Sequence, residues 1–242
     1  MLFLIDLDGT LVNSDHLHYE SYAKILGMKV EQIQEIVETI GMTNFLIDFP
    51  DQKEIREKKL QEMLKIEYIE LVKNADKFIN FINDNDINHV VVTNSNRRVV
   101  EHFKNKLPIL NKIKNWVVRE DYVNPKPNSE CYKLAIDLYG KGETQVLGFE
   151  NSKEGVHALT GVVKEIFCIQ PHTDYLKIID VIKTRCPKKF GMPPTNLNRM
   201  AKKRLKLSFI VSAMAGSLAL GIVLLNLRKG FQMYSGRDTD SL

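Results

Sequence analysis

A chain of 242 residues is long enough for one core domain with a smaller insert, and its net charge of +4 is too small to indicate a nucleic-acid-binding protein. Hydrophobic residues make up 44% of the chain and charged residues 26%, which is ordinary for a globular protein. Three cysteines without a CxxC spacing argue against a disulfide framework and fit a reducing compartment.

The chain begins with a short apolar run, residues 2–5, which predicts a strand buried on both faces. Acidic residues start at Asp6, which is too early for the hydrophobic region of a signal peptide, so we expect no signal peptide here. Asp6 and Asp8 follow the strand directly, where open α/β sheets bind their ligands. Because two carboxylates this close repel each other, a cation or an electrophilic substrate would relieve the repulsion.

Residues 15–74 predict a small helical cap. Apolar residues recur at helical spacing in two segments that end near Gly27 and Gly41. A third segment, 51–72, has opposite charges four residues apart, as in a solvated helix. Because the cap directly follows the first strand and its acids, we expect it to act as a lid.

From residue 75 onward, strand-like and helix-like stretches alternate. Strands are predicted at residues 89–93, 116–118, 145–149 and 165–169. This alternation predicts βαβ units with right-handed crossovers, and therefore an α/β fold with a Rossmann-like parallel sheet. We assign the catalytic core to residues 1–14 and 75–185.

Polar groups also stand at or beside the ends of the later strands. Thr93 and Asn94 precede a helix start and could cradle a phosphate, although helix capping alone explains them equally well. Lys126 lies between two prolines, which reduces the entropy lost when its ammonium binds an anion; by itself, an exposed lysine is the commoner interpretation. Glu150 and Asn151 add an acid and a carboxamide after another strand.

These features occur in the order of the four motifs of the haloacid dehalogenase superfamily, which they resemble. The matching segments are Asp6-Leu7-Asp8-Gly9-Thr10, Thr93-Asn94, Lys126-Pro127 and Gly148-Phe149-Glu150-Asn151-Ser152. The resemblance covers residues 2–185. The position of the insert resembles the helical-cap subgroup, which includes phosphoglycolate phosphatase and beta-phosphoglucomutase.

The resemblance implies a role for each residue. Asp6 would be the nucleophile that forms an aspartyl-phosphate, and Asp8 the general acid and base. Thr93, Asn94 and Lys126 would hold the phosphoryl oxygens. Because the two aspartates titrate as a pair, we expect the surroundings of Asp8 to stabilise its anion less than those of Asp6.

The resemblance also implies a Mg²⁺ site. Its ligands would be Asp6, the backbone carbonyl of Asp8, Glu150 and Asn151. The subgroup commonly has aspartate where Asn151 stands, so we expect looser metal binding. His18 resembles a histidine that the mutase uses near its acid/base, although a helix-face histidine without a chemical role explains it equally well.

The sequence favours a phosphatase that hydrolyses a small phosphorylated metabolite, and two alternatives stay open. The first is a phosphomutase of the beta-phosphoglucomutase type, which Asn44 disfavours because the mutase has a basic residue there. The second is a catalytically weak, phospho-ligand-binding membrane adaptor, which Asn151 keeps open. The acid at Asp8 disfavours dehalogenation, because the dehalogenases of the superfamily lack it.

The composition changes after residue 185. Residues 186–206 read as a basic linker, residues 207–227 contain no charge and are long enough for the ~20 residues of a membrane span, and residues 228–242 form a short polar tail. The basic flank precedes the span, which predicts a tail-anchored, single-pass membrane protein with its catalytic domain in the cytosol. The basic residues would contact the lipid bilayer rather than nucleic acid, and small-residue spacings would permit a homodimer through the span.

Overall fold

The sheet contains five parallel strands in the order β3-β2-β1-β4-β5, in a computed structural model that describes residues 1–185 and residue 190. The strands are β1 (Leu2–Ile5), β2 (Asn88–Val92), β3 (Trp116–Val117), β4 (Val146–Glu150) and β5 (Glu165–Cys168). β1 is central, and Leu2 lies opposite Asn88 on one side and Val146 on the other. The predicted α/β core with a Rossmann-like parallel sheet is confirmed.

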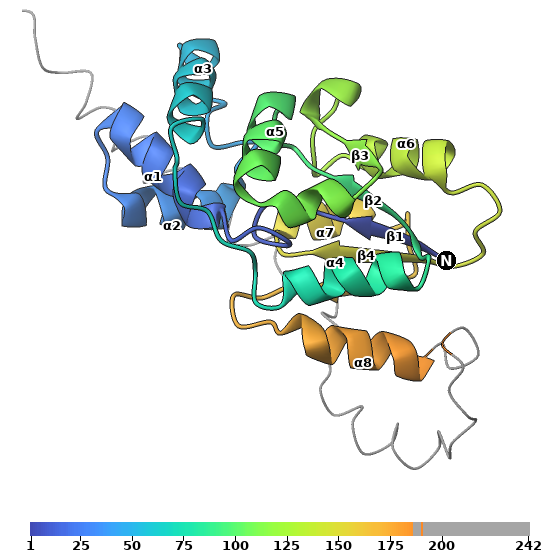
Figure 1. Cartoon of the computed structure of the whole chain (residues 1–242). Helices are drawn as coiled ribbons and strands as arrows, with labels where there is room; N and C mark the ends of the chain where they lie inside the picture. The colour runs from blue at the N-terminus through green and yellow to red at the C-terminus, as the bar shows by residue number, and fades with distance from the viewer. Residues whose placement is uncertain (186–189, 191–242) are drawn as a thin grey trace, which may run out of the picture. The chain divides into compact units, whose positions relative to one another are not determined.

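Helices pack on both faces of this sheet (Figure 1). They are α4 (Ala75–Asp84), α5 (Arg97–Lys106), α6 (Glu130–Tyr139), α7 (Lys153–Leu159) and α8 (Tyr175–Arg185), with the short 3-10 helices η1 (Pro108–Lys112) and η2 (Arg119–Asp121). Because side chains alternate along a strand, Phe3 and Ile5 pack with α4, α5 and α8, whereas Leu2 and Leu4 pack with α6 and α7. Burying each of these side chains stabilises the fold by ~1.5–3 kcal/mol.

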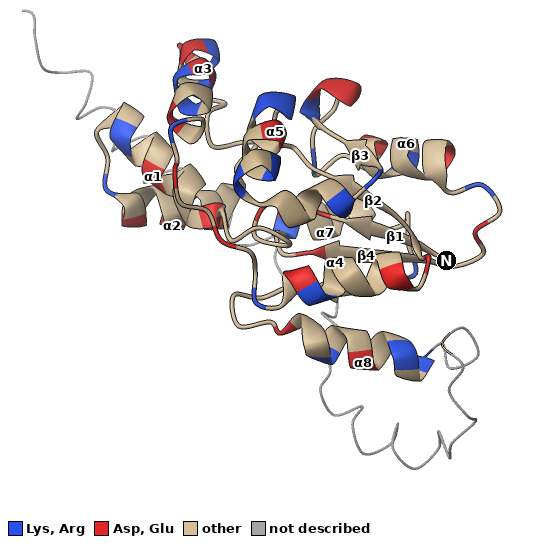
Figure 2. Cartoon of the chain, in the orientation of Figure 1, with Lys and Arg blue, Asp and Glu red and all other residues tan. Residues whose placement is uncertain are grey.

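A helical insert follows β1. It consists of α1 (Asp15–Leu26), α2 (Val30–Ile40) and α3 (Gln52–Met63). Its small core contains Tyr22, Ala23, Ile33, Val37, Phe45, Leu46 and Ile55. α3 carries both signs of charge (Figure 2), including a Glu54–Lys58 ion pair of 2.7 Å one turn apart, as a solvent-facing helix does. In Figure 1, β1 points toward the insert, so the insert stands at the carboxyl ends of the strands.

The transmembrane part of the predicted fold requires a correction. The predicted span at 207–227, and the linker and tail beside it, lie outside the described residues apart from Phe190. In the described part of the chain, no helix is long and apolar enough to cross a membrane. The longest helices there, α1 and α3, have 12 residues each, against the ~20 that a bilayer requires. The predicted fold is therefore corrected to an α/β core with a helical insert and no membrane-spanning helix in the described residues, and the described structure gives no support to a tail-anchored membrane protein.

Candidate active site

Asp6 and Asp8 lie at the carboxyl end of β1. The backbone N–H of Asp6 donates to the carbonyl of Phe149 at 2.9 Å, which holds Asp6 as a continuation of the strand. Gly9 then turns the chain with a φ of 70°. A Cβ atom on Gly9 would lie 1.9 Å from the amide nitrogen of Asn151, so only glycine fits at this turn. The turn therefore keeps residues 6–10, which we call the acidic loop, against the end of β4.

Lys126 joins two of the predicted acids. Its Nζ donates to Asp6 Oδ1 at 2.6 Å, to Glu150 Oε1 at 2.8 Å and to the carbonyl of Val92 at 2.9 Å. The lysine is 3% exposed and Glu150 is fully buried. Glu150 also accepts a hydrogen bond from the Tyr132 hydroxyl at 3.1 Å. The predicted lysine and acids thus meet at one edge of the sheet, and Lys126 is not an exposed loop side chain.

This buried charge cluster alters the acidity of its members. Burial and the charge of Glu150 raise the pKa of Asp6 well above its ordinary value, against the opposing effect of Lys126. Burial would lower the pKa of Lys126, but the charges of Asp6 and Glu150 outweigh it and raise that pKa. Lys126 is therefore an ammonium ion, and the negative charge of Asp6 is disfavoured.

Asp8 is surrounded by hydrogen-bond donors. They are His18 Nε2 at 2.8 Å, Ser14 Oγ at 2.7 Å, Ser95 Oγ at 2.6 Å and Thr93 Oγ1 at 3.1 Å. Burial would raise the pKa of Asp8, but His18 and the serine hydroxyls outweigh it and hold that pKa below its ordinary value. The expected order of the two aspartates is thus reversed, because these donors stabilise the anion of Asp8 more than that of Asp6.

His18 connects Asp8 to the insert. Its Nδ1 lies 2.6 Å from Nζ of Lys59 on α3. Burial and Lys59 lower the pKa of His18, and burial lowers the pKa of Lys59 to about 8. An ammonium on Lys59 donates to Nδ1 of a neutral His18, so Nε2 carries the hydrogen that is donated to Asp8. Sequence reasoning missed Lys59, which looks like any other lysine of a charged helix.

Thr93 and Asn94 reach the same edge, but protein groups occupy their polar atoms. Asn94 Oδ1 accepts from the backbone N–H of Lys126 at 3.1 Å and from the Tyr122 hydroxyl at 2.7 Å. Asn94 thereby fixes the loop that carries Lys126. Thr93 Oγ1, which donates to Asp8, also accepts from the backbone N–H of Ser95 at 2.9 Å.

The insert contacts this edge a second time, through the segment after α2. Glu154 accepts hydrogen bonds from the backbone N–H groups of Met42 at 2.9 Å and Thr43 at 3.3 Å. Thr43 Oγ1 donates to the carbonyl of Lys126 at 2.8 Å. The segment 42–43 is therefore bonded both to α7 and to the lysine loop.

Asn151 is held between the loop that follows β1 and the start of α1. Its Oδ1 accepts from Thr10 Oγ1 at 3.1 Å, and its Nδ2 donates to Asp15 Oδ2 at 2.8 Å. Asp15 was not predicted as a site residue. Burial and the charges of Asp8 and Glu150 raise the pKa of Asp15 to about 6.

A model of the family described as haloacid dehalogenase-like hydrolase matches residues 3–159. The chain belongs to this family. The predicted resemblance and the predicted enzyme class, a hydrolase of the haloacid dehalogenase type, are confirmed. The phosphorylated carbohydrates phosphatase of Thermotoga maritima is 23% identical in an alignment 168 residues long, which covers 64% of this chain and 78% of that protein.

Two solved structures show the same fold. A hydrolase from Pseudomonas syringae has a TM-score of 0.62 at 17% identity, over 75% of this chain and 99% of its own. CbbY from Rhodobacter sphaeroides in complex with phosphate has a TM-score of 0.59 at 18% identity, over 72% of this chain and 89% of its own. The two alignments cover 99% and 89% of the solved chains, which indicates that the three proteins share one core fold.

Haloacid dehalogenase-like hydrolases generally use Mg²⁺, and the donor atoms present fit that ion. Four carboxylates lie near one another: burial and the charges of Asp8 and Glu150 raise the pKa of both Asp6 and Asp15, and the Lys126 ammonium contacts Asp6 and Glu150. A cation would reduce this mutual repulsion. In the described residues, no three acidic, histidine or cysteine side chains are placed to hold a metal by themselves. Mg²⁺ nevertheless keeps several waters and needs few protein oxygens, so carboxylate, amide and carbonyl donors suit it.

The raised pKa of Asp15 predicts a pH-dependent stability. The folded state holds the Asp15 proton more tightly than the unfolded state, so wild-type stability falls as the pH rises from about 4 to about 6. Asp15→Asn lacks this step. In thermal unfolding without divalent cations, we expect this variant to melt above wild type at pH 8 and the difference to shrink at pH 4. An equal difference at both pH values would contradict the prediction.

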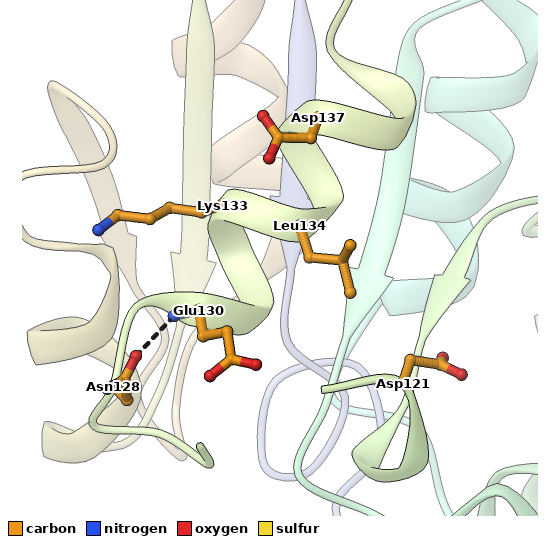
Figure 3. Close-up of a pocket in the computed structure, with 6 residues that line it drawn as sticks. All are labelled: Asp121, Asn128, Glu130, Lys133, Leu134 and Asp137. Atoms are coloured by element: carbon orange, nitrogen blue, oxygen red, sulfur yellow. Dashed lines mark hydrogen bonds between the residues drawn. The ribbon is translucent and has the colours of Figure 1, made fainter. Parts of the chain in front are cut away.

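A separate hollow lies beside α6 and η2 and contains none of the predicted site residues (Figure 3). It measures about 470 Å³ and is lined by Asp121, Asn128, Glu130, Lys133, Leu134 and Asp137. Asn128 accepts a hydrogen bond from the backbone N–H of Glu130 at 2.9 Å. With three acids and one lysine, this hollow would repel a phosphate ester, so it does not compete with the site at the strand ends.

Proposed function

We propose that this hydrolase is a Mg²⁺-dependent phosphatase that cleaves a small phosphorylated metabolite, with Asp6 as the nucleophile. The observation that carries the proposal is the buried contact of Lys126 with both Asp6 and Glu150, at 2.6 and 2.8 Å. A phosphatase needs its nucleophile next to a fixed cation that can bind phosphoryl oxygens. The Thermotoga maritima relative, named as a phosphatase of phosphorylated carbohydrates, supports a small phosphate ester as substrate.

The proposed reaction has two steps. The carboxylate form of Asp6, which the Lys126 ammonium supports at 2.6 Å, attacks phosphorus. The bond from phosphorus to the ester oxygen breaks, and Asp8 gives its proton to the departing alkoxide. Water then attacks the phosphorus of the aspartyl-phosphate and gives a proton to Asp8, which releases phosphate and restores Asp6. Lys126 holds the phosphoryl oxygens, and Thr93 and Asn94 lie beside them.

Asp8 must gain a proton before the first step, because its surroundings favour the anion. Lys59 and His18 form a route for this proton. At neutral pH the Lys59 ammonium can donate to His18 Nδ1, and His18 Nε2–H can donate to Asp8. The insert therefore provides a proton source for the core.

The cation would be held by Asp6, the backbone carbonyl of Asp8, Glu150 and Asn151, with waters. Mg²⁺ would neutralise part of the charge of the phosphate and so reduce its repulsion from Asp6.

Lys59→Met tests the proton route. We expect kcat to fall about 10-fold, with a smaller change in KM, because His18 loses the donor that fixes its tautomer. The loss should be larger for an alkyl phosphate than for an aryl phosphate, whose leaving group needs no proton. Equal losses on both substrates would contradict a role in protonation.

A single phosphate suits the segment after α2 better than a bisphosphate. Residues 42–45 contain no lysine or arginine, and the Asn44 amide donates to the carbonyl of Ile40 at 3.0 Å. A second phosphate would therefore find no cationic partner in this segment. This observation favours the phosphatase over a phosphomutase.

The proposed function is tested with the full chain, an aryl phosphate and a panel of phosphorylated metabolites. We expect steady phosphate release that requires Mg²⁺ and stops with EDTA. A requirement for a sugar bisphosphate activator would favour the mutase. Tight phosphate-ester binding without turnover would contradict the phosphatase and favour a binding protein.

A further inference from the structure

Asp15 and Asn151 form a contact that joins α1 to the end of β4. Asp15 is the first residue of α1 and Asn151 follows β4, yet Asn151 Nδ2 donates to Asp15 Oδ2 at 2.8 Å. An acid in the first turn of a helix also interacts favourably with the helix dipole. The dipole explains an acid at this position, but it does not explain its bond to an amide in the loop after β4.

The contact fixes the orientation of the Asn151 amide. The carboxylate of Asp15 can accept hydrogen bonds but cannot donate them, so it pairs with the NH₂ group of the amide and not with its oxygen. Because an amide is planar, its oxygen must then face the other way, where it accepts from Thr10 Oγ1 at 3.1 Å. Asp15 therefore determines the direction in which the side-chain oxygen of Asn151 points.

The same contact brings a carboxylate to the acidic loop. A Cβ atom on Gly9 would lie 2.3 Å from Asp15 Oδ2 and 1.9 Å from Asn151 Nδ2, so both side chains lie against the backbone that follows Asp8. Asp6 and Glu150 share Lys126, and Asp8 is bonded to His18. Asp15 has no lysine, arginine or histidine ion-pair partner within the described residues, so its charge is available to a cation.

We propose that Asp15 is a positioning residue for the divalent cation of this site. It holds the oxygen of Asn151 on the side of the Thr10 hydroxyl, away from its own carboxylate, and it supplies the negative charge that a neutral amide lacks. This inference rests on the proposed function, because the phosphatase requires the cation. In this arrangement Asn151 supplies the oxygen and Asp15 supplies the negative charge that a single acidic ligand would supply together.

The test measures cation binding directly, without substrate. Mg²⁺ binding by calorimetry and Mn²⁺ binding by electron paramagnetic resonance are compared for the full-length wild type, Asp15→Asn, and the double variant Asp15→Asn/Asn151→Asp. Glu20→Gln serves as the matched control, because it removes a carboxylate from an exposed position of the same helix. The double variant keeps one acid and one amide in contact with their places exchanged.

We expect Asp15→Asn to weaken cation binding by ~10-fold or more. Glu20→Gln should bind like wild type, and the double variant should recover the lost affinity. In turnover, Asp15→Asn should need more Mg²⁺ for half-maximal rate and recover most of kcat at saturating Mg²⁺.

Wild-type affinity in Asp15→Asn, or no recovery in the double variant, would overturn the role of Asp15 and leave the proposed phosphatase standing. If the wild type binds neither cation, both the inference and the Mg²⁺ dependence fail. If Asp15→Asn does not fold, the double variant still decides, because it retains the charge and the hydrogen bond: weak binding by it overturns the inference.

Discussion

With Asp6 replaced by asparagine, we expect phosphate release to fall by ~10⁴-fold or more, because a carboxamide cannot form the acyl-phosphate. The fold should survive this change. Burial and Glu150 disfavour the negative charge of Asp6, so the neutral amide should leave the melting temperature equal to or above that of wild type. A phosphate-release assay and thermal unfolding measure the two effects. A residual rate within tenfold of wild type would contradict the assignment.

Asp8→Asn is the matched control for this prediction. It removes the proton donor and leaves the nucleophile, so its effect should depend on the leaving group. We expect a loss of ~10²–10⁴-fold for an alkyl phosphate and a smaller loss for an aryl phosphate. Asp6→Asn should instead lower the rate of phosphate release from both substrates by the same factor. An identical pattern for the two variants would contradict their separate roles.

Lys126→Met should lose both activity and stability. It leaves the buried carboxylates of Asp6 and Glu150 beside each other without their shared ammonium. Removing one partner of a buried ion pair typically costs ~3–5 kcal/mol of unfolding free energy, and the fixed phosphate-binding cation is lost as well. Denaturant unfolding and phosphate release measure the two losses.

The double variant Lys126→Met/Glu150→Gln separates stability from catalysis. It removes one of the two uncompensated charges, so it should regain part of the unfolding free energy without regaining activity. Activity in the double variant would show that Lys126 is only structural. An unchanged melting temperature in the single variant would contradict the buried ion pairs.

The position of the site could be predicted because its main residues follow strands. Parallel strands end at one edge of a sheet, so Asp6 and Glu150 had to come together once β1 and β4 became neighbours. Helix α8 was also predictable and was missed. Its buried residues Tyr175, Ile178, Ile179 and Ile182 recur at helical spacing.

The acidity of Asp8 and the roles of Lys59 and Asp15 could not be read from the sequence. The donors to Asp8 come from the start of α1 and the end of β2, two segments that only the fold brings together. Lys59 reaches His18 across 41 positions of the chain, and Asp15 reaches Asn151 across 136. Neither pair has a local pattern, because both depend on how the insert packs against the core.

The most direct test of a nucleophilic Asp6 is to trap the phosphorylated enzyme. Full-length protein is mixed with a substrate that supports turnover, quenched in acid and reduced with borohydride, which converts an aspartyl-phosphate to homoserine. We predict that peptide mass spectrometry finds homoserine at position 6 and only in samples that received both substrate and Mg²⁺. Homoserine at another aspartate, or an unmodified Asp6 during active turnover, would contradict the mechanism.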